Sequence, residues 1–572
     1  MLSSLKVLDR YDGLLLMLIL LHVMLVPHNS ANESVYLQVV HDITYRGTRW
    51  GTLLRHHHFN SSIQAQHNFL GELVLGILAI GPVRLIYNLW RARNWALQQP
   101  IPHPLALLLR SWMEPKLPAL ILIRCILGSL SWLAWTQLRY ALPNAHTRTS
   151  FARFLCAQFH PIFYASRVLP DTFASIAASF AYGLHLRGHE LACTVLLSFS
   201  AIVWRFEVAV FLLCFSLLGV IVSTEAQLRS RKLLSLGIAT LKGGVAAGAL
   251  SMLMKSSVVQ RVLSPQWDVL YSGAAVHQTW EWKLQPSWWY WTSALPRALL
   301  PIPVYFPLFP VGLLRIPDAR QTALPALAFV ASLSVFSPKE LRFILPTIPL
   351  INAAAGMTLG RLHEFGWTAI ESNKLHQAAV ALNELDARPY RRVLKEAKRK
   401  RLVIQVVRLC QMSLFVGALA AHIGGLSVAM RSYPGGEALS ALHRAHGLAQ
   451  RNSGSLECPE PFVYIDPLSS MTGISPFLEI PGWKYSVGEH HSSKNVDWSV
   501  YTHLVTERDS VPGFEPVYAA KAFDGFSLRY PFLHFTERIH VLRRLTRAPV
   551  TNQSMDHQLP LPGCWPARLP WT

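Results

Sequence analysis

Long runs of apolar residues separated by short polar stretches make up the first three quarters of the chain. A helix that crosses a membrane needs about 20 predominantly apolar residues. The candidate runs are 14–26, 69–90, 117–138, 151–185, 190–222, 233–254, 291–314, 322–337, 343–360 and 402–430. Two of them, 151–185 and 190–222, are long enough to contain more than one span or a re-entrant piece. The pattern therefore predicts an all-α polytopic membrane protein with about 10–12 transmembrane helices.

Prolines interrupt the apolar run at 291–314 and its flanks. They are Pro296, Pro301, Pro303, Pro307 and Pro310. A proline inside a helix removes a backbone hydrogen bond, and broken helices at membrane depth are tolerated where they line a cavity. We expect broken helices around a cavity in this part of the chain.

The pattern changes after residue 430. From Tyr433 onward, turn residues alternate with short β-prone stretches such as 462–465 and 500–505. We predict a transmembrane region over 1–430 and a small α/β or mainly β module over 431–546. A polar, proline-rich tail follows over 547–572.

Composition excludes a string of soluble domains, because only 15% of the 572 residues are charged and 51% are hydrophobic. Soluble chains carry about a quarter charged residues. The formal net charge is +21, but the basic residues cluster between apolar runs, as at 91–93 and 391–401. This distribution is typical of cytosolic loops, so we do not expect nucleic-acid binding.

Basic residues also predict the orientation. Lys6 and Arg10 place the N-terminus in the cytosol, and the segment 361–401 holds ten Lys and Arg against five acids. That segment is the predicted cytosolic loop, which makes the loop 31–68 and the region 431–572 exoplasmic. The glycosylation sequons agree with this topology, since they start at Asn32, Asn60 and Asn552.

The seven cysteines show no paired metal-binding spacing. Only Cys458 and Cys564 lie in a polar region, and the sequence leaves open whether these two form a disulfide. The tract 56–58 holds three adjacent histidines, which cannot easily converge on one ion. We expect no metal site and no cofactor.

Several ionisable residues stand inside apolar stretches. A charge inside the membrane costs a few kcal/mol or more, so such a group pairs, faces a cavity or binds an anion. One interpretation of Arg205 is that it forms a structural ion pair with Glu207 at the end of a helix. Lys339 and Arg342 lie at the exoplasmic mouth, where two cations favour binding of a phosphate. The other polar or ionisable residues inside these apolar stretches are Gln158, His160, Arg167 and Glu340.

The predicted exoplasmic loop 31–68 contains Glu33, His41 and Asp42 directly after the first span. A carboxylate at the membrane surface can act as general base on a hydroxyl nucleophile. The alternative is that each is a solvated loop residue. The sequence has no glycine-rich phosphate loop and no nucleophile elbow, so it supports neither an ATP-driven pump nor a hydrolase triad.

Several sequence blocks, in order, resemble glycosyltransferase family 22, the multi-span mannosyltransferases that use dolichyl-phosphate-mannose. The blocks are NESVYLQVVHDITY (32–45), AQFHPIFYASRVLPD (157–171), VWRFEVAVFL (203–212), WYWTSALPRALL (289–300) and SPKELRFILPTIPLIN (337–352). Further blocks resemble the branch of the family that adds an α-1,6-linked mannose. These are SYPGGEALSALHR (432–444), YIDPLSSMTGISPFL (464–478), WKYS (483–486) and YTHLVTE (501–507).

The resemblance implies a GT-C fold with a catalytic first luminal loop and a luminal C-terminal module, in the membrane of the endoplasmic reticulum. The family's acidic pair corresponds to Asn32 and Glu33, so the resemblance makes Glu33 the general base. Pro338 stands where the family has a histidine. No role that needs an imidazole is therefore carried over to that position.

The implied reaction is inverting transfer of mannose from dolichyl-phosphate-mannose to a dolichyl-pyrophosphate-linked seven-mannose oligosaccharide, as the eighth mannose for N-glycosylation. The expected donor-phosphate and substrate-binding residues are Lys339, Arg342, Glu340, Arg167, Arg297, Arg205, His41, Asp42 and His160. Three alternatives remain: a mannosyltransferase of the same family acting on glycosylphosphatidylinositol anchors, an inactive relative because of Asn32, and a membrane transporter. A transporter predicts internal repeats, and the sequence shows none.

Overall fold

The structure is a computed structural model of the chain. It describes residues 8–46, 69–97, 116–222, 226–259, 285–299, 302–335, 339–362, 364, 387–452, 461–480, 482–488, 497–527, 529 and 532–545. Three features of the sequence lie outside these residues: Cys458 and Cys564, for which a disulfide was left open, the histidine tract 56–58 and the tail 547–572. Four described cysteines are free: Cys125, Cys156, Cys193 and Cys214.

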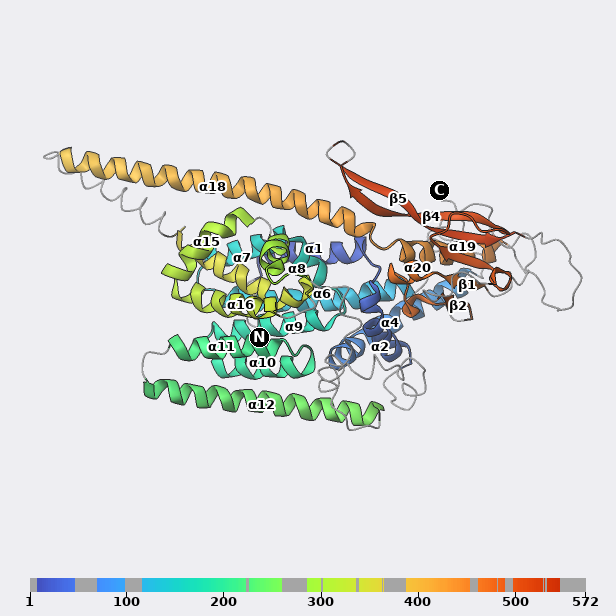
Figure 1. The fold of residues 1–572 in the computed structure, drawn as a ribbon, viewed down its shortest axis with the longest axis horizontal. Helices are drawn as coiled ribbons and strands as arrows, with labels where there is room; N and C mark the ends of the chain where they lie inside the picture. The colour runs from blue at the N-terminus through green and yellow to red at the C-terminus, as the bar shows by residue number, and fades with distance from the viewer. Residues whose placement is uncertain are drawn as a thin grey trace, which may run out of the picture.

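A helical bundle forms one end of an elongated molecule, and a smaller module with a β-sheet forms the other (Figure 1). Five helical segments in the described part are long and apolar enough to cross a membrane: Leu70–Ala92, Lys116–Ala141, Ser230–Met252, Leu341–Leu362 and Met412–Met430. Two shorter apolar helices are Glu190–Val203 and Val208–Ile221. These helices fit the predicted polytopic membrane protein, while the number of 10–12 spans stays a prediction.

The two longest apolar runs are broken, as their length indicated. The run 151–185 contains the end of α7 (Ala145–Ala157), the short α8 (Phe159–Tyr164) and α9 (Pro170–His185). Pro170 starts α9, where a proline loses no helical hydrogen bond. The run 190–222 divides into α10 (Glu190–Val203) and α11 (Val208–Val222). Each break carries charged residues to one end of the bundle.

The proline-rich stretch is also broken, in agreement with the prediction. A π-helical turn (Tyr290–Ala294) leads into α14 (Leu295–Ala298), and then α15 (Ile302–Arg315) and α16 (Pro317–Val335) follow. A 3-10 turn, η6 (Leu341–Thr347), opens the next membrane-length segment.

Two helices extend along the outside of the bundle: α12 (Ala226–Val259) and the 44-residue α18 (Ala387–Met430) (Figure 1). The last part of the predicted cytosolic loop 361–401 therefore belongs to α18. Similarly, the described part of the predicted loop 31–68 is mostly a helix, α2 (Ala31–Arg46).

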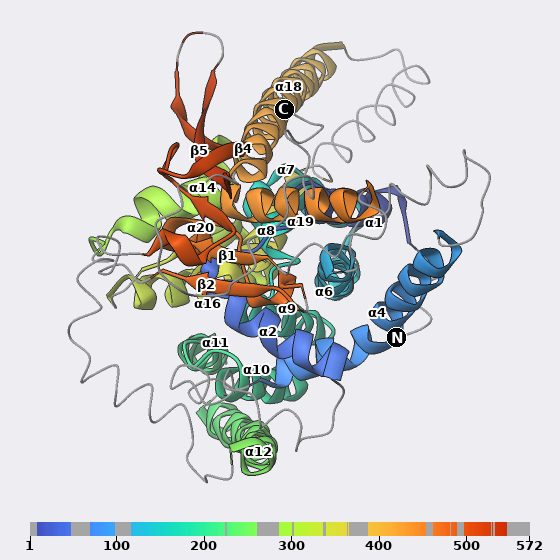
Figure 2. The same ribbon diagram turned by 90° about the vertical axis from the view of Figure 1, so that its right-hand side faces the viewer.

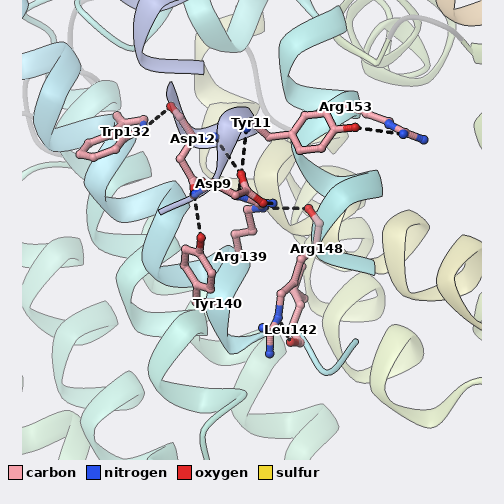
Figure 3. A network of polar contacts seen from close by, with 9 residues as sticks. All are labelled: Asp9, Tyr11, Asp12, Trp132, Arg139, Tyr140, Leu142, Arg148 and Arg153. Atoms are coloured by element: carbon pink, nitrogen blue, oxygen red, sulfur yellow. Dashed lines mark hydrogen bonds and ion pairs between the residues drawn. The ribbon is translucent and has the colours of Figure 1, made fainter. Parts of the chain in front are cut away.

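The first helix, α1 (Arg10–Leu25), is held against α6 (Lys116–Ala141) by a polar network at its N-terminus (Figure 3). Asp9 caps the helix and forms a reciprocal capping box with Asp12. Arg139 of α6 donates hydrogen bonds to both carboxylates, at 2.9 Å to Asp9 Oδ1 and 2.5 Å to Asp12 Oδ1. The Tyr140 hydroxyl donates to Asp12 Oδ2 at 2.7 Å.

The module begins with α19 (Pro434–Asn452) and contains a five-stranded mixed sheet in the order β2-β1-β3-β5-β4. The strands are β1 (Phe462–Ile465), β2 (Lys484–Val487), β3 (His503–Thr506), β4 (Phe514–Phe526) and β5 (Leu533–Arg544). β1 runs parallel to β2 and β3, and β5 runs antiparallel to β3 and β4. A short helix, α20 (Pro467–Met471), follows β1. The small sheet in this part of the chain fits the α/β module expected there, while the module boundaries 431–546 stay a prediction.

Candidate active site

Glu33 lies in the first turn of α2, and Figures 1 and 2 show this helix at the end of the bundle that faces the module. Its side chain is 2% exposed, and the Ser30 backbone N–H donates to its Oε2 at 3.0 Å. A carboxylate in this position is favoured by the partial positive charge of the helix N-terminus. The helix start thus fixes one oxygen of the predicted general base.

Two buried arginines hold the same oxygen. Arg124 of α6 and Arg167, between α8 and α9, lie 2.9 and 3.2 Å from Glu33 Oε2. Each guanidinium also donates to backbone carbonyls of the connection between α1 and α2, those of Val26 and His28. The arginines therefore fix both the carboxylate and the backbone that leads to it.

The other carboxylate oxygen, Glu33 Oε1, is buried and accepts no hydrogen bond from any residue that the structure describes. Buried polar atoms in proteins are nearly always paired, so such an atom calls for an explanation. A carboxylate oxygen held in place and left without a donor can accept the proton of a substrate hydroxyl.

The module contacts this cluster through the YPGG block. The Arg167 guanidinium lies 5.3 Å from the centre of the Tyr433 ring. A Cβ on Gly436 would lie 2.7 Å from the His28 ring and 2.9 Å from the Gly473 carbonyl oxygen, closer than packing allows. Gly473 itself has φ +112°, a conformation that favours glycine. Glycine at 436 therefore permits the close approach of α19 to the loop before Glu33.

His28 is the titratable group of that loop. Burial, together with the nearby Arg124, Arg167 and Arg444, lowers the pKa of His28 to about 3. Its imidazole is therefore neutral around pH 7, which avoids adding a third positive charge beside the two guanidiniums.

A second ionic cluster is centred on Asp171, in the first turn of α9. Arg205 Nε lies 3.3 Å from Asp171 Oδ1, and Arg342 Nε lies 3.7 Å from Oδ2. Each arginine has an additional acidic partner: Glu207 at 2.6 Å for Arg205 and Glu340 at 2.5 Å for Arg342. Asp171 thus brings together two predicted phosphate-binding arginines that are far apart in sequence.

Phe343 lies beside both of these guanidiniums, 4.5 Å from Arg205 and 5.7 Å from Arg342. The two arginine side chains are 22% and 19% exposed, whereas Arg124 and Arg167 are buried. A planar guanidinium stacked on a ring presents its edge to an anion in a fixed direction. The second cluster is consequently the one that an outside phosphate can reach.

Tyr36 of α2 lies near the second cluster. Burial raises the pKa of the Tyr36 hydroxyl, with Glu72 and Asp171 adding to the effect while Arg205 and Arg342 oppose it. The phenol is protonated around pH 7, and a protonated phenol can donate a hydrogen bond beside this cluster.

Three predicted residues have their described contacts elsewhere. Lys339 is buried and donates to the Gln285 carbonyl at 3.1 Å. Arg297 donates to the Ser293 carbonyl at 3.0 Å. His160 lies on α8 and has Arg297 as an electrostatic neighbour. Among the contacts described for the chain, none links these three residues to Glu33 or Asp171.

His41 and Asp42 form a separate polar cluster farther along α2. His41 Nδ1 lies 3.0 Å from Asp42 Oδ1, and Lys116 Nζ lies 2.6 Å from His41 Nε2. Gln38 also donates to Asp42 Oδ1 at 3.1 Å. Nine residues of helix, about 13 Å at 1.5 Å per residue, separate Asp42 from Glu33. The two carboxylates therefore cannot act on one hydroxyl.

The residues that the sequence interpretation missed are Arg124, Asp171 and Phe343. Arg124 is the one charged residue inside the apolar run 117–138, and this isolation was a usable signal. Asp171 follows Pro170, a proline–acid pair typical of a helix start. Nothing in the sequence predicted that Phe343 would stack against Arg205 and Arg342.

The two clusters consist of guanidiniums, carboxylates and phenols. Over the residues whose placement is described, no three His, Cys, Asp or Glu side chains group in a way that could hold a metal ion. The chemistry open to these residues is proton transfer to a carboxylate and stabilisation of an anion by arginine.

The Alg9-like mannosyltransferase family matches residues 78–449, which is more than half of the chain. The chain belongs to this family of glycosyltransferases, which confirms the resemblance seen in the sequence blocks.

Among curated proteins, the chain is 29% identical over 490 residues to one from Drosophila melanogaster, covering 85% of this chain and 61% of that relative. It is 25% identical over 533 residues to one from Arabidopsis thaliana, covering 91% of each. A Saccharomyces cerevisiae relative is 22% identical over 573 residues, covering 93% of this chain and 92% of that one. All three relatives are named Dol-P-Man:Man(7)GlcNAc(2)-PP-Dol alpha-1,6-mannosyltransferase.

Among solved structures, the crystal structure of ArnT from Cupriavidus metallidurans in the apo state is similar to 93% of this chain and 96% of that chain. The TM-score is 0.49 and the sequence identity is 15%.

Proposed function

We propose that this protein is the α-1,6-mannosyltransferase that transfers mannose from dolichyl-phosphate-mannose to the dolichyl-pyrophosphate-linked seven-mannose oligosaccharide, within a GT-C fold. The family and the shared name of relatives that align over most of the chain support this proposal. The observation that carries it is the buried Oε1 of Glu33, to which no described residue donates a hydrogen bond, together with the partly exposed Arg205 and Arg342.

The proposed reaction is a single inverting displacement. The 6-hydroxyl oxygen of the acceptor attacks the anomeric carbon of the donor mannose, and the bond from that carbon to the phosphate oxygen breaks. The hydroxyl proton passes to Glu33 Oε1. A β-linked donor gives an α-linked product, and dolichyl phosphate leaves with the bonding electron pair. A positioned general base contributes roughly a hundredfold or more to such a step.

Arg342 and Arg205 are the proposed partners of the leaving phosphate. Negative charge grows on the phosphate oxygen as its bond to carbon breaks, and fixed guanidiniums stabilise that charge. Glu340 and Glu207 occupy the same guanidiniums in the structure. The donor phosphate therefore replaces these partially exposed carboxylates when it binds, while buried Asp171 keeps both arginines in place.

The proposed orientation places this site on the luminal side of the endoplasmic reticulum membrane. α18 begins in the basic segment that predicts the cytosolic side, and it ends at Met430, where the module starts. If the basic end of α18 is cytosolic, then a single crossing puts the module and the Glu33 end of α2 in the lumen. A donor with a polyprenyl chain reaches such a site from the bilayer.

An acceptor panel tests the proposal. Purified protein in detergent or nanodiscs receives labelled dolichyl-phosphate-mannose and lipid-linked oligosaccharides with six, seven or eight mannoses. We expect extension of the seven-mannose acceptor alone, with a product that linkage analysis assigns as α-1,6. Transfer only to a glycosylphosphatidylinositol precursor would instead support the family's other branch, and no transfer by folded protein would support an inactive relative.

We also propose that transfer needs no divalent metal. The charge stabilisation in the proposed step comes from arginine side chains, and the base is a carboxylate. Transfer should continue at an unchanged rate in excess EDTA, whereas a loss that added Mg²⁺ or Mn²⁺ restores would contradict this part of the proposal.

A further inference from the structure

The strands β4 and β5 form a ribbon far longer than the other strands of the module, with 13 and 12 residues against four in each of the others. Phenylalanines gather at its free end. Phe526 is 76% exposed and Phe532 is 62% exposed. The Phe523 ring lies 4.9 Å from that of Phe526 and 6.2 Å from that of Phe535. Such a cluster of exposed aromatic side chains usually marks an interaction site.

The ribbon is attached to the end of a membrane-length helix. The Phe523 backbone N–H donates to the carbonyl of Arg431 at 3.3 Å. Arg431 directly follows α18, whose last 19 residues form the candidate span Met412–Met430. The free end of the ribbon therefore starts where the polypeptide leaves the apolar segment.

A second contact fixes the direction of the ribbon. The Tyr518 hydroxyl donates to Glu437 Oε1 at 2.8 Å, and Glu437 in turn pairs with Arg431 at 3.0 Å. With two attachment points along β4, the ribbon cannot rotate freely about Arg431. Figures 1 and 2 show the ribbon leaving the module near the module-side end of α18, with its free end projecting away from the rest of the module.

One face of α18 is itself apolar and exposed. Met412, Val416, Leu419 and Ile423 lie along the span Met412–Met430, and their side chains are exposed. A membrane-crossing helix with such a face borders lipid, so the bilayer surface on the module side lies close to the end of α18, where the ribbon is attached through Arg431.

We propose that the phenylalanine end of the β4–β5 ribbon inserts into the membrane interface on the module side and anchors the module to the bilayer. Three residues of strand, about 10 Å at 3.3 Å per residue, separate Phe523 from Phe526. This reach matches the 5–10 Å depth at which apolar groups of interfacial segments lie. The exposed Lys521 and Arg538 lie on the strands on the module side of the phenylalanines, where they are placed to contact lipid phosphates.

The anchor fixes the tilt of the module over the bundle. Because β4 is tied to α19 through Tyr518 and Glu437, the position of the ribbon is coupled to the YPGG junction near Glu33. The proposal does not depend on which reaction the protein performs or which side of the membrane the module occupies. It requires only that α18 crosses the bilayer.

Site-specific photocrosslinking of the full-length protein tests the anchor. Benzoylphenylalanine replaces Phe526, and the purified protein is reconstituted in nanodiscs of phosphatidylcholine. The substitution keeps an aromatic ring at this exposed position, so it should not disturb folding. Val416 on the exposed face of α18 provides the positive control.

Val500 provides the matched negative control, because it is apolar and exposed but lies at the opposite end of the ribbon. Arg544 pairs there with Phe514 at the base of the ribbon and donates to the Trp498 carbonyl at 2.7 Å. After illumination, mass spectrometry quantifies the protein–lipid adduct at each position.

We expect at least about tenfold more lipid adduct at 526 than at 500, since burial of one phenylalanine side chain favours the apolar phase by more than that factor. Equal adduct yields at 526 and 500, with efficient labelling at 416, would overturn the proposal. A protein adduct at 526 in place of the lipid adduct would also overturn it and would identify the ribbon as a protein-binding element.

Discussion

At the level of single residues, the two carboxylate oxygens of Glu33 have different surroundings. Oε2 is shared between Arg124 and Arg167, while Oε1 has no described donor. Fixing one oxygen orients the other, and a pre-oriented base saves the entropy of positioning it during the reaction. The guanidiniums also prevent the buried carboxylate from remaining an unpaired charge.

The two cations that the sequence favoured for phosphate binding should differ in effect. Arg342→Ala should raise the KM for the dolichyl-phosphate-mannose donor by about tenfold or more, the loss expected for one charge-assisted contact. Lys339→Ala should change it less than about twofold, since Lys339 donates to the Gln285 carbonyl. Initial rates over a donor series measure both values, and equal effects of the two substitutions would contradict the assignment.

The glycine junction gives a second prediction at this scale. Gly436→Ala should lower the free energy of unfolding by about 1–3 kcal/mol, the usual range for overpacking. The new methyl group would meet the His28 ring and the Gly473 carbonyl. Thermal unfolding in detergent measures the change. Gly417→Ala is the control, because a Cβ there has nothing within 4 Å, and an equal loss in both variants would contradict the argument.

His28 predicts a pH dependence. Its pKa is about 3 in the folded protein and about 6.5 when exposed, so the unfolded chain binds the extra proton between these values. The free energy of unfolding should therefore fall as pH drops from 6.5 toward 3, by at most about 1.4 kcal/mol per pH unit from this group. Above pH 6.5 His28 should contribute no pH dependence.

The measurement compares thermal midpoints of the wild type and His28→Gln at pH 7 and pH 5. The wild type should lose more on acidification than the variant does. Parallel losses would show that another group controls the acid sensitivity.

Sequence reasoning at this scale identified charged residues better than it identified their partners. Glu33, Arg167, Arg205 and Arg342 were all candidates, and the structure places them in two clusters. The centre of the second cluster, Asp171, was missed because its role depends on residues 34 and 171 positions away in the chain. The sequence neighbours of Lys339 favoured a role in phosphate binding, but its side chain donates a hydrogen bond to the Gln285 carbonyl instead.

At the level of helices and strands, the breaks between helices position the charged residues of the site. The interruption at 204–207 carries the partly exposed Arg205, and the interruption after α8 carries the buried Arg167 that pairs with Glu33. The sequence predicted breaks in these long apolar runs because a run well above 20 residues exceeds one span. It did not predict that α18 continues through 387–401. Eight of the 15 residues of that stretch are Lys or Arg, which favour a helix as well as a cytosolic location.

The attachment of α1 to α6 is testable as an element. Arg139→Met should lower the free energy of unfolding by about 3–5 kcal/mol, because it leaves the buried Asp12 without its guanidinium. Combining it with Asp12→Asn should cost less than the sum of the single changes. Thermal unfolding of the four proteins of the cycle provides the measurement, and strict additivity would show that this ion pair does not couple the helices.

At the scale of the whole molecule, the module is joined to the bundle at two places. It contacts the bundle beside Glu33 through the YPGG junction, and α18, which ends in a candidate membrane span, leads directly into it. The sequence predicted the division at residue 430, since the apolar runs end there. The mixed sheet order could not be predicted, because pairing between distant strands depends on tertiary packing.

The proposed topology predicts that an external protease reaches the basic segment 387–401 but not the module. In sealed microsomes, trypsin added outside should cleave within the basic segment 387–401 and leave a protected fragment that contains the module. Detergent should then expose the module to cleavage. Loss of a C-terminal tag without detergent would contradict a luminal module.

Glu33 is the proposed base of mannosyl transfer. The most direct measurement is the single-turnover rate with saturating dolichyl-phosphate-mannose and the lipid-linked seven-mannose acceptor, for the wild type, Glu33→Gln and Asp42→Asn. We predict that Glu33→Gln lowers the rate by about a hundredfold or more while donor binding persists, and that Asp42→Asn retains turnover. Sustained turnover by folded Glu33→Gln, with turnover lost in Asp42→Asn, would contradict the claim and move the base to the other end of α2.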